Sequence, residues 1–432
     1  MFLTRDTGLS DTGHPNDSRP ASRSLVSSLY TIGILLYSFG VRIAAWLGNA
    51  KAQQWIEGRK SLDMNPADDG NWIWFHAASL GEFEQGRPVI EAIKREHPEF
   101  KILLSFFSPS GYEVRKDYPL ADEVLYLPAD TPRHAAVWVR RHHFVAAFFI
   151  KYEFWFNYMR ALHEVGIPLF YVSLILNDKS FFFKPYGRWF RKQLHNVTHF
   201  YVQDVTTEKL LREHGFGNVT LCGDTRFDRV AAIAAQVKPF PEVERFIDGR
   251  QCIIAGSTWP PDERLLAAFF PQMPSDYCLI IAPHDVSASH VAQIKAMFPE
   301  SQCYSSLDAE CCSRILIVDT IGILSQLYQY ARFVYIGGGF GVNIHNIQEP
   351  VTFGCPVVFG PKHTSFKEAV DLVGLQGAFP VSNAEELESV FLRLINDEAF
   401  LKQASETCLH YLKSQVGATQ VIMDGFEKAL FS

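Results

Sequence analysis

Short apolar segments alternate with helix-like segments along most of this chain, and this alternation constrains the fold more than any other feature. One series of apolar segments runs from residues 72–76 to residues 199–202, and a second runs from 252–255 to 356–359. Helical patterns fill the gaps between them. Strands that alternate with helices are typical of a parallel sheet covered on both faces. We therefore predict an α/β protein with two Rossmann-like domains that face a cleft, at 51–237 and 238–432.

Composition excludes several classes of protein. The 432 residues are 47% hydrophobic and 20% charged, which is enough apolar material for full cores. A net charge of −7 argues against a general nucleic-acid binder. The eight cysteines show no C-x-x-C pair and no Cys/His metal spacing, and the chain has no D-x-D pair. We predict no metal site and reduced thiols.

The N-terminal region predicts an association with a membrane. Residues 24–41 carry no charge and are about long enough to cross a bilayer, near the lower limit. Lys51, Arg59 and Lys60 follow, which places the next domain on the cytoplasmic side. We predict a disordered extension at 1–24 and an uncleaved anchor at 25–50, which either spans the membrane or lies in its interface. A buried helix of a soluble domain is the alternative.

The segment 334–361 combines a strand, a glycine-rich turn and a polar stretch. Its glycines are Gly337, Gly338, Gly339 and Gly341. Glycines let a backbone approach a ligand, and a helix expected to start near residues 345–346 would favour an anion. Glu349 offers a carboxylate to ribose hydroxyls. The segment favours a site for a nucleotide phosphate and ribose, although it matches neither the Walker nor the dinucleotide fingerprint. Glycines that serve packing alone are the alternative.

Residues 76–82, HAASLGE, follow the first predicted strand. A turn at Ser79 and Gly81 would place Glu82 in the opening turn of the next helix. A carboxylate there can face the cleft and remove a proton from an attacking hydroxyl. The structural alternative is a capping box, because Ser79 and Glu82 match S-x-x-E.

Three further motifs end strands of the first half. SFFSPSG at 105–111 contains Ser108 and either turns the chain or binds a polar ligand. KYEFWFN at 151–157 sets Lys151 and Glu153 among aromatics, which suits a sugar or a carboxylate, or a plain strand end. GDTRFD at 223–228 offers Arg226 to a phosphate or carboxylate, or to a salt bridge with a neighbouring aspartate.

Three motifs end strands of the second half. AGSTW at 255–259 and APHD at 282–285 either recognise a phosphate or form tight turns. DTIG at 319–322 is a further turn whose backbone groups could contact a base.

Taken together and in this order, the motifs resemble the 3-deoxy-D-manno-octulosonic acid (Kdo) transferases of lipopolysaccharide synthesis. The most specific segments are HAASLGE, GDTRFD, AGSTW, DTIGIL and HNIQEP, and the likeness runs from about residue 29 to the C-terminus. The family implies a GT-B glycosyltransferase in the inner (cytoplasmic) membrane, with its catalytic domains on the cytoplasmic side. It implies inverting transfer of Kdo from CMP-Kdo to a lipid A precursor (lipid IVA), with no metal and no cofactor.

The resemblance also implies roles for individual residues. Glu82 matches the family's general base, while Lys151 and Arg226 are expected to stabilise charge on the donor. The substrate-binding candidates are Ser79, Gly81, Ser108, Glu153, Pro283, His284, Ile321, Gly322, Ile323, His345, Asn346, Ile347, Gln348 and Glu349. Those from Pro283 onward match the CMP contacts, and the helix start at His345 would hold the phosphate.

The chain departs from the family at several positions. Lys151 stands where the family has Glu, Arg226 where it has Lys, and His284 where it has Arg. The family's Asn-Ala-Arg-Leu-Ser run is replaced near residues 173–177, and its Gly-Glu-Leu reads Gly-Ile-Leu at 322–324. A GT-B transferase for another nucleotide sugar, or a non-catalytic membrane-associated relative, is the alternative function.

Overall fold

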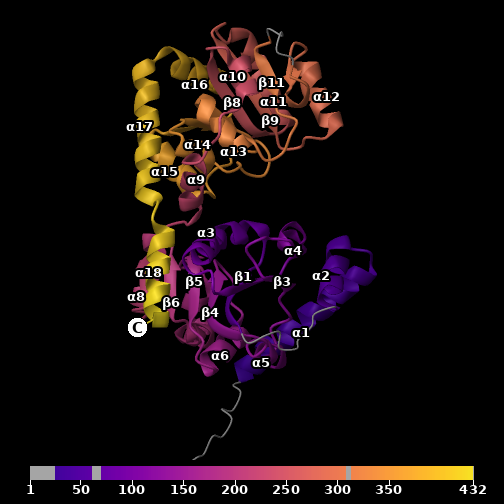
Figure 1. Cartoon of the computed structure of the whole chain (residues 1–432), viewed down its shortest axis with the longest axis vertical. Helices are drawn as coiled ribbons and strands as arrows, with labels where there is room; N and C mark the ends of the chain where they lie inside the picture. Colours follow the sequence, from indigo (N-terminus) through magenta and orange to yellow (C-terminus); the bar gives the residue numbers. More distant parts are fainter. Residues whose placement is uncertain (1–24, 61–69, 308–312, 432) are drawn as a thin grey trace, which may run out of the picture.

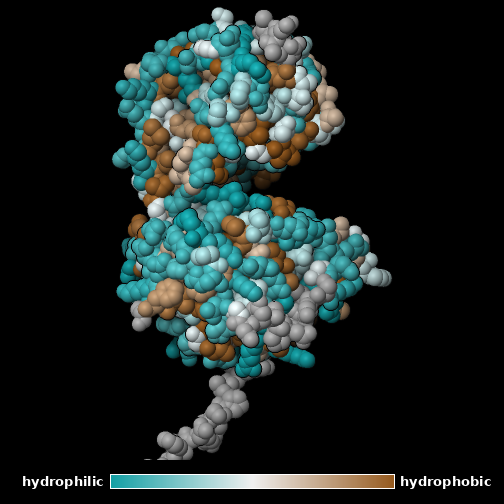
Figure 2. Space-filling model, in the orientation of Figure 1, coloured by the Kyte–Doolittle hydropathy of each residue, from teal (hydrophilic) through white to brown (hydrophobic). Residues whose placement is uncertain are grey.

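The computed structural model describes residues 25–60, 70–307 and 313–431, and it consists of two α/β lobes (Figure 1). Each lobe contains a seven-stranded parallel sheet. Figure 2 shows that the lobes join on the side of the C-terminal helices and part on the opposite side. The α/β class and the two Rossmann-like units predicted from the sequence are confirmed. The extension predicted at 1–24 lies outside the described residues.

The first sheet has the strand order β3-β2-β1-β4-β5-β6-β7. Its strands are β1 (Asn71–Ala77), β2 (Lys101–Phe106), β3 (Glu123–Tyr126), β4 (His143–Ile150), β5 (Leu169–Leu174), β6 (His199–Val202) and β7 (Val219–Leu221). The helices between them are α3 (Leu80–Glu96), α4 (Pro109–Arg115), α5 (Pro132–Trp138), α6 (Phe156–Glu164), α7 (Arg188–Gln193) and α8 (Val205–Glu213). Successive side chains of β1 enter opposite cores, because Trp74 packs in one cluster and Phe75 in the other.

The second sheet has the strand order β10-β11-β9-β8-β12-β13-β14. Its strands are β8 (Gln251–Thr258), β9 (Tyr277–Pro283), β10 (Gln302–Cys303), β11 (Ile315–Ile317), β12 (Ala331–Ile336), β13 (Val357–Phe359) and β14 (Ala378–Pro380). Its helices are α10 (Pro241–Ile247), α11 (Pro260–Phe269), α12 (Ala288–Met297), α13 (Leu324–Leu327), α14 (Gln348–Thr352), α15 (Lys367–Leu375), α16 (Ala384–Asn396) and α17 (Glu398–Gln415).

The sequence prediction missed three strands, β7, β10 and β14. All three are two or three residues long and lie at sheet edges. An edge strand pairs on one side only, so a short one needs no continuous apolar run. The apolar pattern therefore found the central strands and not these.

Two helices revise the predicted domain boundaries. Helix α9 (Arg226–Ala234) was assigned to the first domain, but its Phe227 and Val230 pack in a core of the second. Helix α18 (Ala418–Phe431) was assigned to the second domain, but its Ile422 and Phe426 pack on the first sheet. The chain thus passes from the first lobe to the second at α9 and returns to the first at α18. Asp228 of α9 accepts hydrogen bonds from backbone N–H groups at the start of α18, which joins these two connections.

The predicted anchor forms helix α1 (Leu25–Trp46), followed by α2 (Ala50–Lys60). Helix α1 is long and apolar enough to cross a membrane, and only 6% of its most apolar window is buried. It nevertheless contacts the first lobe: the Tyr30 hydroxyl donates to buried Asp130 at 2.6 Å, and the Tyr37 ring meets Phe107 at 6.0 Å. One face of α1 is therefore attached to the protein, and most of the large side chains exposed on the rest are apolar.

Candidate functional site

The three predicted catalytic residues come together between the two lobes. Glu82 follows β1, Lys151 follows β4, and Arg226 opens α9, which crosses to the second lobe. The charges of Glu82 and Arg226 both act on the pKa of Lys151. The Arg226 guanidinium lies 3.6 Å from Glu368 of α15, a helix of the second lobe. This cluster occupies the carboxyl edge of the first sheet, where parallel sheets place their ligands.

Glu82 lies in the opening turn of α3. Its Oε2 accepts hydrogen bonds from the backbone N–H groups of Ala78, at 2.7 Å, and Ser79, at 3.2 Å. Burial, and then the negative charge of Glu153, raise the pKa of Glu82 to about 7, against the pull of those N–H groups and of Lys151. The capping box is confirmed, because Glu82 caps the helix. The role of Glu82 as a general base stays a prediction, with which a pKa of about 7 is compatible.

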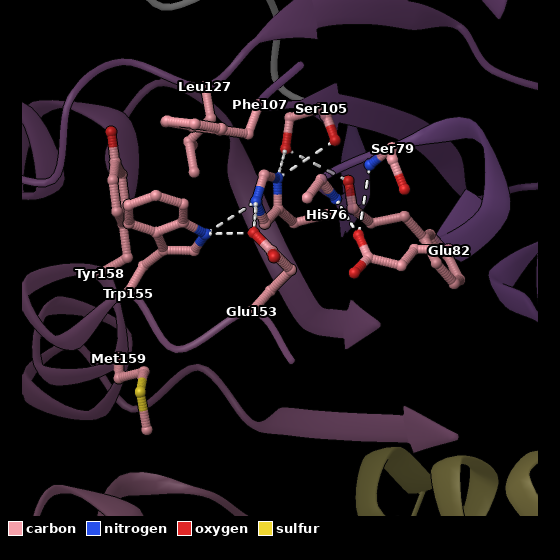
Figure 3. A network of polar contacts seen from close by, with 12 residues as sticks. His76, Ser79, Glu82, Ser105, Phe107, Leu127, Glu153, Trp155, Tyr158 and Met159 are labelled. Atoms are coloured by element: carbon pink, nitrogen blue, oxygen red, sulfur yellow. Dashed lines mark hydrogen bonds and ion pairs between the residues drawn. The ribbon is translucent and has the colours of Figure 1, made fainter. Parts of the chain in front are cut away.

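A buried network lies beside Glu82 (Figure 3). His76 Nε2 is 3.0 Å from Glu153 Oε2, and His76 Nδ1 is 2.8 Å from the Ser105 hydroxyl. The Trp155 indole N–H is 2.7 Å from the same Glu153 oxygen. The Tyr171 hydroxyl donates to the Glu153 backbone carbonyl at 2.7 Å. Glu153 is therefore held in one orientation by His76 and Trp155, close enough for its charge to act on Glu82. The sequence ranked Glu153 as a substrate contact and did not single out His76.

Lys151 adopts a left-handed backbone conformation, with φ of 63°. Its N–H donates to the Val172 carbonyl, which holds the turn after β4 against β5. Burial, and then the charge of Arg226, lower the pKa of Lys151. Ser173 and Ser257, which also lie near carboxyl ends of strands, share this φ region. Such strained positions are enriched at functional sites.

Arg226 is an ion-pair partner as well as a candidate donor ligand. Its guanidinium donates to Asp224 Oδ2 at 2.9 and 2.6 Å. Gln85 of α3 is 3.4 Å from the same oxygen, and the Thr225 hydroxyl donates to the Gln85 carbonyl at 2.5 Å. The salt bridge offered as the alternative for this motif is therefore present. The motif also links the two lobes, because it contacts α3 of the first and α15 of the second.

On the second sheet, the predicted contacts follow three strands. Pro283 ends β9 and His284 follows it, the 321–323 turn follows β11, and residues 345–349 follow β12. Trp259, which was not a predicted contact, follows β8, the strand between β9 and β12. Ile321 is 81% exposed at the tip of its turn, and Gly322 has φ of 97°. The carboxyl edge of this sheet thus gathers the predicted CMP contacts, as it should for a Rossmann-like unit.

Three rings stack on this edge. His284 lies 4.5 Å from His345 and 4.7 Å from Trp259, measured between ring centroids. The Trp259 indole N–H donates to His345 Nε2 at 2.9 Å, which leaves the proton of neutral His345 on Nδ1. Burial, and then the charge of His284, lower the pKa of His345. The sequence placed His284 and His345 in the site but treated Trp259 only as part of a motif.

The helix predicted to begin at His345 begins instead at Gln348, and α14 has only five residues. The His345 N–H donates to the Gly337 carbonyl, and the Gln348 N–H donates to the Asn346 side chain at 3.0 Å. These N–H groups are not free for a phosphate. Asn346 also donates to Glu349 at 3.3 Å, and burial raises the pKa of Glu349. Ile347 and Gln348 are buried.

The glycines before this segment serve packing. A Cβ on Gly337 would lie 2.4 Å from the Ser257 carbonyl, and one on Gly339 would lie 2.7 Å from the Gly360 backbone. Gly338 has φ of 91°. The packing alternative therefore explains these glycines. Their lack of a side chain lets the loops after β8, β12 and β13 approach one another closely.

Two further candidates, Ser108 and Gly81, lie in turns near Glu82. Ser108 caps α4, accepting from Ser110 N at 3.3 Å, as the turn interpretation predicts. Its backbone N–H donates to the Ala78 carbonyl, which brings it beside the Ser79 turn. Gly81 is exposed in the first turn of α3. Across the parts of the chain that the structure describes, no group of three His, Cys, Asp or Glu residues is arranged to hold a metal ion.

Comparisons with known proteins agree with this geometry. The family model described as 3-Deoxy-D-manno-octulosonic-acid transferase (kdotransferase) matches residues 48–229. The 3-deoxy-D-manno-octulosonic acid transferase of Aquifex aeolicus is 25% identical over 76% of this chain and 88% of its own length. A bifunctional glycosyltransferase/methyltransferase of Fusobacterium nucleatum subsp. nucleatum is 24% identical over 81% of this chain, which spans only 56% of that protein.

Among solved structures, the UDP-GlcNAc 2-epimerase of Neisseria meningitidis bound to UDP-GlcNAc superposes with a TM-score of 0.58 at 12% identity. The match covers 83% of this chain and 100% of the epimerase, and it shows the fold alone. The fold is GT-B: two Rossmann-like units whose strand ends meet across a cleft. The chain is thus similar to Kdo transferases over most of its length, and the Kdo transferase family model matches its first lobe.

Proposed function

We propose that this protein transfers Kdo from CMP-Kdo to the hydroxyl of an acylated lipid A precursor. The observation that carries the proposal is Glu82: a half-buried carboxyl group with a pKa of about 7, at the edge of the first sheet that faces the second lobe. The acceptor hydroxyl must lose a proton as it attacks. A base whose pKa lies near the working pH removes that proton most effectively.

The two lobes divide the substrates in this proposal. CMP binds at the strand ends of the second sheet, on the His284, His345 and Trp259 rings and beside Glu349. Lys151 and Arg226 lie between the lobes and stabilise the negative charge that develops as CMP leaves. Attack from the side opposite to CMP inverts the anomeric carbon. The reaction needs no metal in this proposal, because cationic side chains face the leaving group.

Helix α1 brings the enzyme to its lipid substrate. Its exposed apolar residues include Leu25, Leu29, Ile32, Leu36, Phe39 and Ile43. They recur at the spacing of one helical face, while Tyr30 and Tyr37 contact the protein. This division favours a helix that lies in the membrane interface. In this proposal the lobes lie on the cytoplasmic side, as the basic residues after α1 predict.

The direct test is to incubate the detergent-solubilised protein with CMP-Kdo and tetraacylated lipid IVA, and to weigh the lipid by mass spectrometry. We expect a gain of one or more Kdo masses, with or without EDTA, and an inverted linkage by NMR. A lipid that gains mass only from another nucleotide sugar would overturn the donor assignment. Activity that EDTA abolishes would overturn the metal-independent mechanism.

A further inference from the structure

An aromatic groove of about 670 Å³ leads from the site to helix α1. Its walls are Tyr30, Ile34, Phe107, Tyr152, Glu153, Phe154, Trp155, Phe156, Phe181 and Phe190. The volume lies within the range of about 300–1,000 Å³ that is typical of ligand pockets. Glu153 is its one carboxylate, so the groove is polar at the end that belongs to the site and apolar along the rest.

The aromatic rings of the groove hold one another in place. Phe156 contacts Tyr30 at 5.1 Å and Phe190 at 5.3 Å, and Phe181 contacts Phe190 at 5.0 Å. The polar atom of Trp155 is already used, because its N–H is bonded to Glu153. The ring therefore presents apolar surface to the groove. A continuous apolar lining of this kind favours burial of a hydrocarbon chain.

The two ends of the groove identify what it would hold. One end is Glu153, whose charge reaches Glu82, and so the groove begins where the acceptor hydroxyl is activated. The other end is Tyr30 and Ile34 of α1, the helix whose outer face is apolar and exposed. A chain lying in this groove would thus connect the reacting hydroxyl with the membrane side of the protein.

Charge beside the groove matches an anionic lipid. Helix α7 (Arg188–Gln193) contributes Phe190 to the groove, and Trp189 to a contact with Tyr30 at 6.2 Å. The same helix lines a neighbouring polar hollow with Arg188, Arg191 and Lys192. Its aromatic residues thus meet the apolar groove, and its cations lie where a phosphate of the same lipid could reach them.

We infer that this groove binds one acyl chain of the acceptor glycolipid while α7 attracts the acceptor's phosphate. The inference rests on the proposed function and deepens it, because it makes acylation part of acceptor recognition. Each methylene that the groove buries should tighten acceptor binding about fourfold. Acylated and deacylated forms of one acceptor should therefore differ mainly in KM.

The test uses the full-length protein with two acceptors, tetraacylated lipid IVA and its deacylated sugar backbone. Ile34→Trp fills the groove from α1. It should raise KM for the acylated acceptor by about tenfold or more, since it displaces at least two methylenes. It should change kcat/KM for the deacylated acceptor by less than about twofold. Val137→Trp, an apolar-to-tryptophan change at an exposed position of α5, should leave both values unchanged.

The outcomes separate the two proposals. No transfer to either acceptor by the unaltered protein would overturn the proposed function. Transfer with a KM that Ile34→Trp leaves unchanged, or changes equally for both acceptors, would overturn the groove alone. Because the variant could misfold, a second measurement uses the unaltered protein with lipid IVA that carries a diazirine in one acyl chain. Photolabelling should fall on α1 and on 181–190, and labelling only elsewhere would overturn the inference.

Discussion

The two lobes carry the same local motif at the same place, and use it differently. In each sheet an interior strand, β1 or β8, runs into a helix whose third residue is a carboxylate: Glu82 in α3 and Asp262 in α11. Asp262 Oδ2 accepts from the N–H groups of Trp259 and Gly338, and Oδ1 accepts from the Tyr335 hydroxyl. It is 1% exposed. Glu82 takes both of its hydrogen bonds on Oε2.

The two carboxylates differ in how many of their oxygens accept structural hydrogen bonds. Both carboxylate oxygens of Asp262 accept structural hydrogen bonds, which join β8, α11 and the loop after β12. Glu82 accepts hydrogen bonds on one oxygen only, and burial, followed by the negative charge of Glu153, raises its pKa to about 7. In the proposed function, the same motif supplies a base where the fold leaves one carboxylate oxygen available and buries the group near a like charge.

The sharpest way to break this comparison is Glu82→Gln. Because the amide cannot take a proton, turnover should fall by about 10²–10⁴-fold. The amide oxygen can still accept from Ala78 and Ser79, so the fold should persist. Turnover is measured by Kdo transfer and the fold by circular dichroism. A folded variant with normal turnover would show that Glu82 is not the base.

Asp262→Asn should lower stability and leave the pH dependence of catalysis unchanged. The amide replaces an acceptor by a donor where three donors converge, so unfolding free energy should fall by about 1–3 kcal/mol. The pH dependence of the surviving activity should match that of the unaltered protein, since no proton at the reaction centre is involved. Chemical denaturation and a pH–rate profile measure the two effects. A shifted acid limb would mean that Asp262, too, acts in the chemistry.

The charges around Glu82 make a paired prediction. Glu153 raises the pKa of Glu82, and Lys151 lowers it. The acid limb of the kcat/KM profile reports the pKa of the base in the free enzyme. Glu153→Gln should shift this limb to lower pH, and Lys151→Met should shift it to higher pH, each by about one pH unit or less. Activity of the first variant then persists to lower pH. Shifts in the same direction, or none, would contradict the electrostatic account.

The smallest expected effect is at the donor edge. Trp259→Phe keeps a stacked ring but removes the hydrogen bond to His345. Because His345 then loses the bond that fixes its ring, affinity for CMP should fall by at most about fivefold, the upper limit set by one net hydrogen bond. Calorimetry with CMP measures it, and the KM for the acceptor should not change. Equal losses for both substrates would point to general damage and not to a role at this edge.

Much of the fold was open to prediction because its central strands are continuous apolar runs. Residues 72–76 were expected as a strand and lie within β1, and residues 252–255 lie within β8. The sequence could not predict which lobe α9 and α18 pack on. An amphipathic pattern indicates that a helix has a buried face, but it does not identify the core that buries it. The crossings of α9 and α18 depend on contacts between distant residues, such as Asp228 with the start of α18.

The site was partly predictable for a similar reason. Parallel strands end at one edge, so motifs that follow strands were expected to meet there, as Glu82 and Lys151 do. The helix start at His345 was wrong, because Asn346 turns the chain locally and delays the helix to Gln348. His76 and Trp259 were passed over, since a histidine or tryptophan at a strand end shows no function until its partner is known.

The sequence by itself determined which residues stand at the ends of the strands, because apolar runs and turn residues act over a few neighbouring positions. The tertiary structure alone decided which of them are chemically available. Glu82 and Asp262 are alike in their local sequence. One lies in the space between the lobes beside Glu153, and the other lies under Tyr335 and Gly338. Burial, charge and hydrogen-bond donors from remote segments set the pKa of a carboxyl group, and those arrive only when the chain is folded.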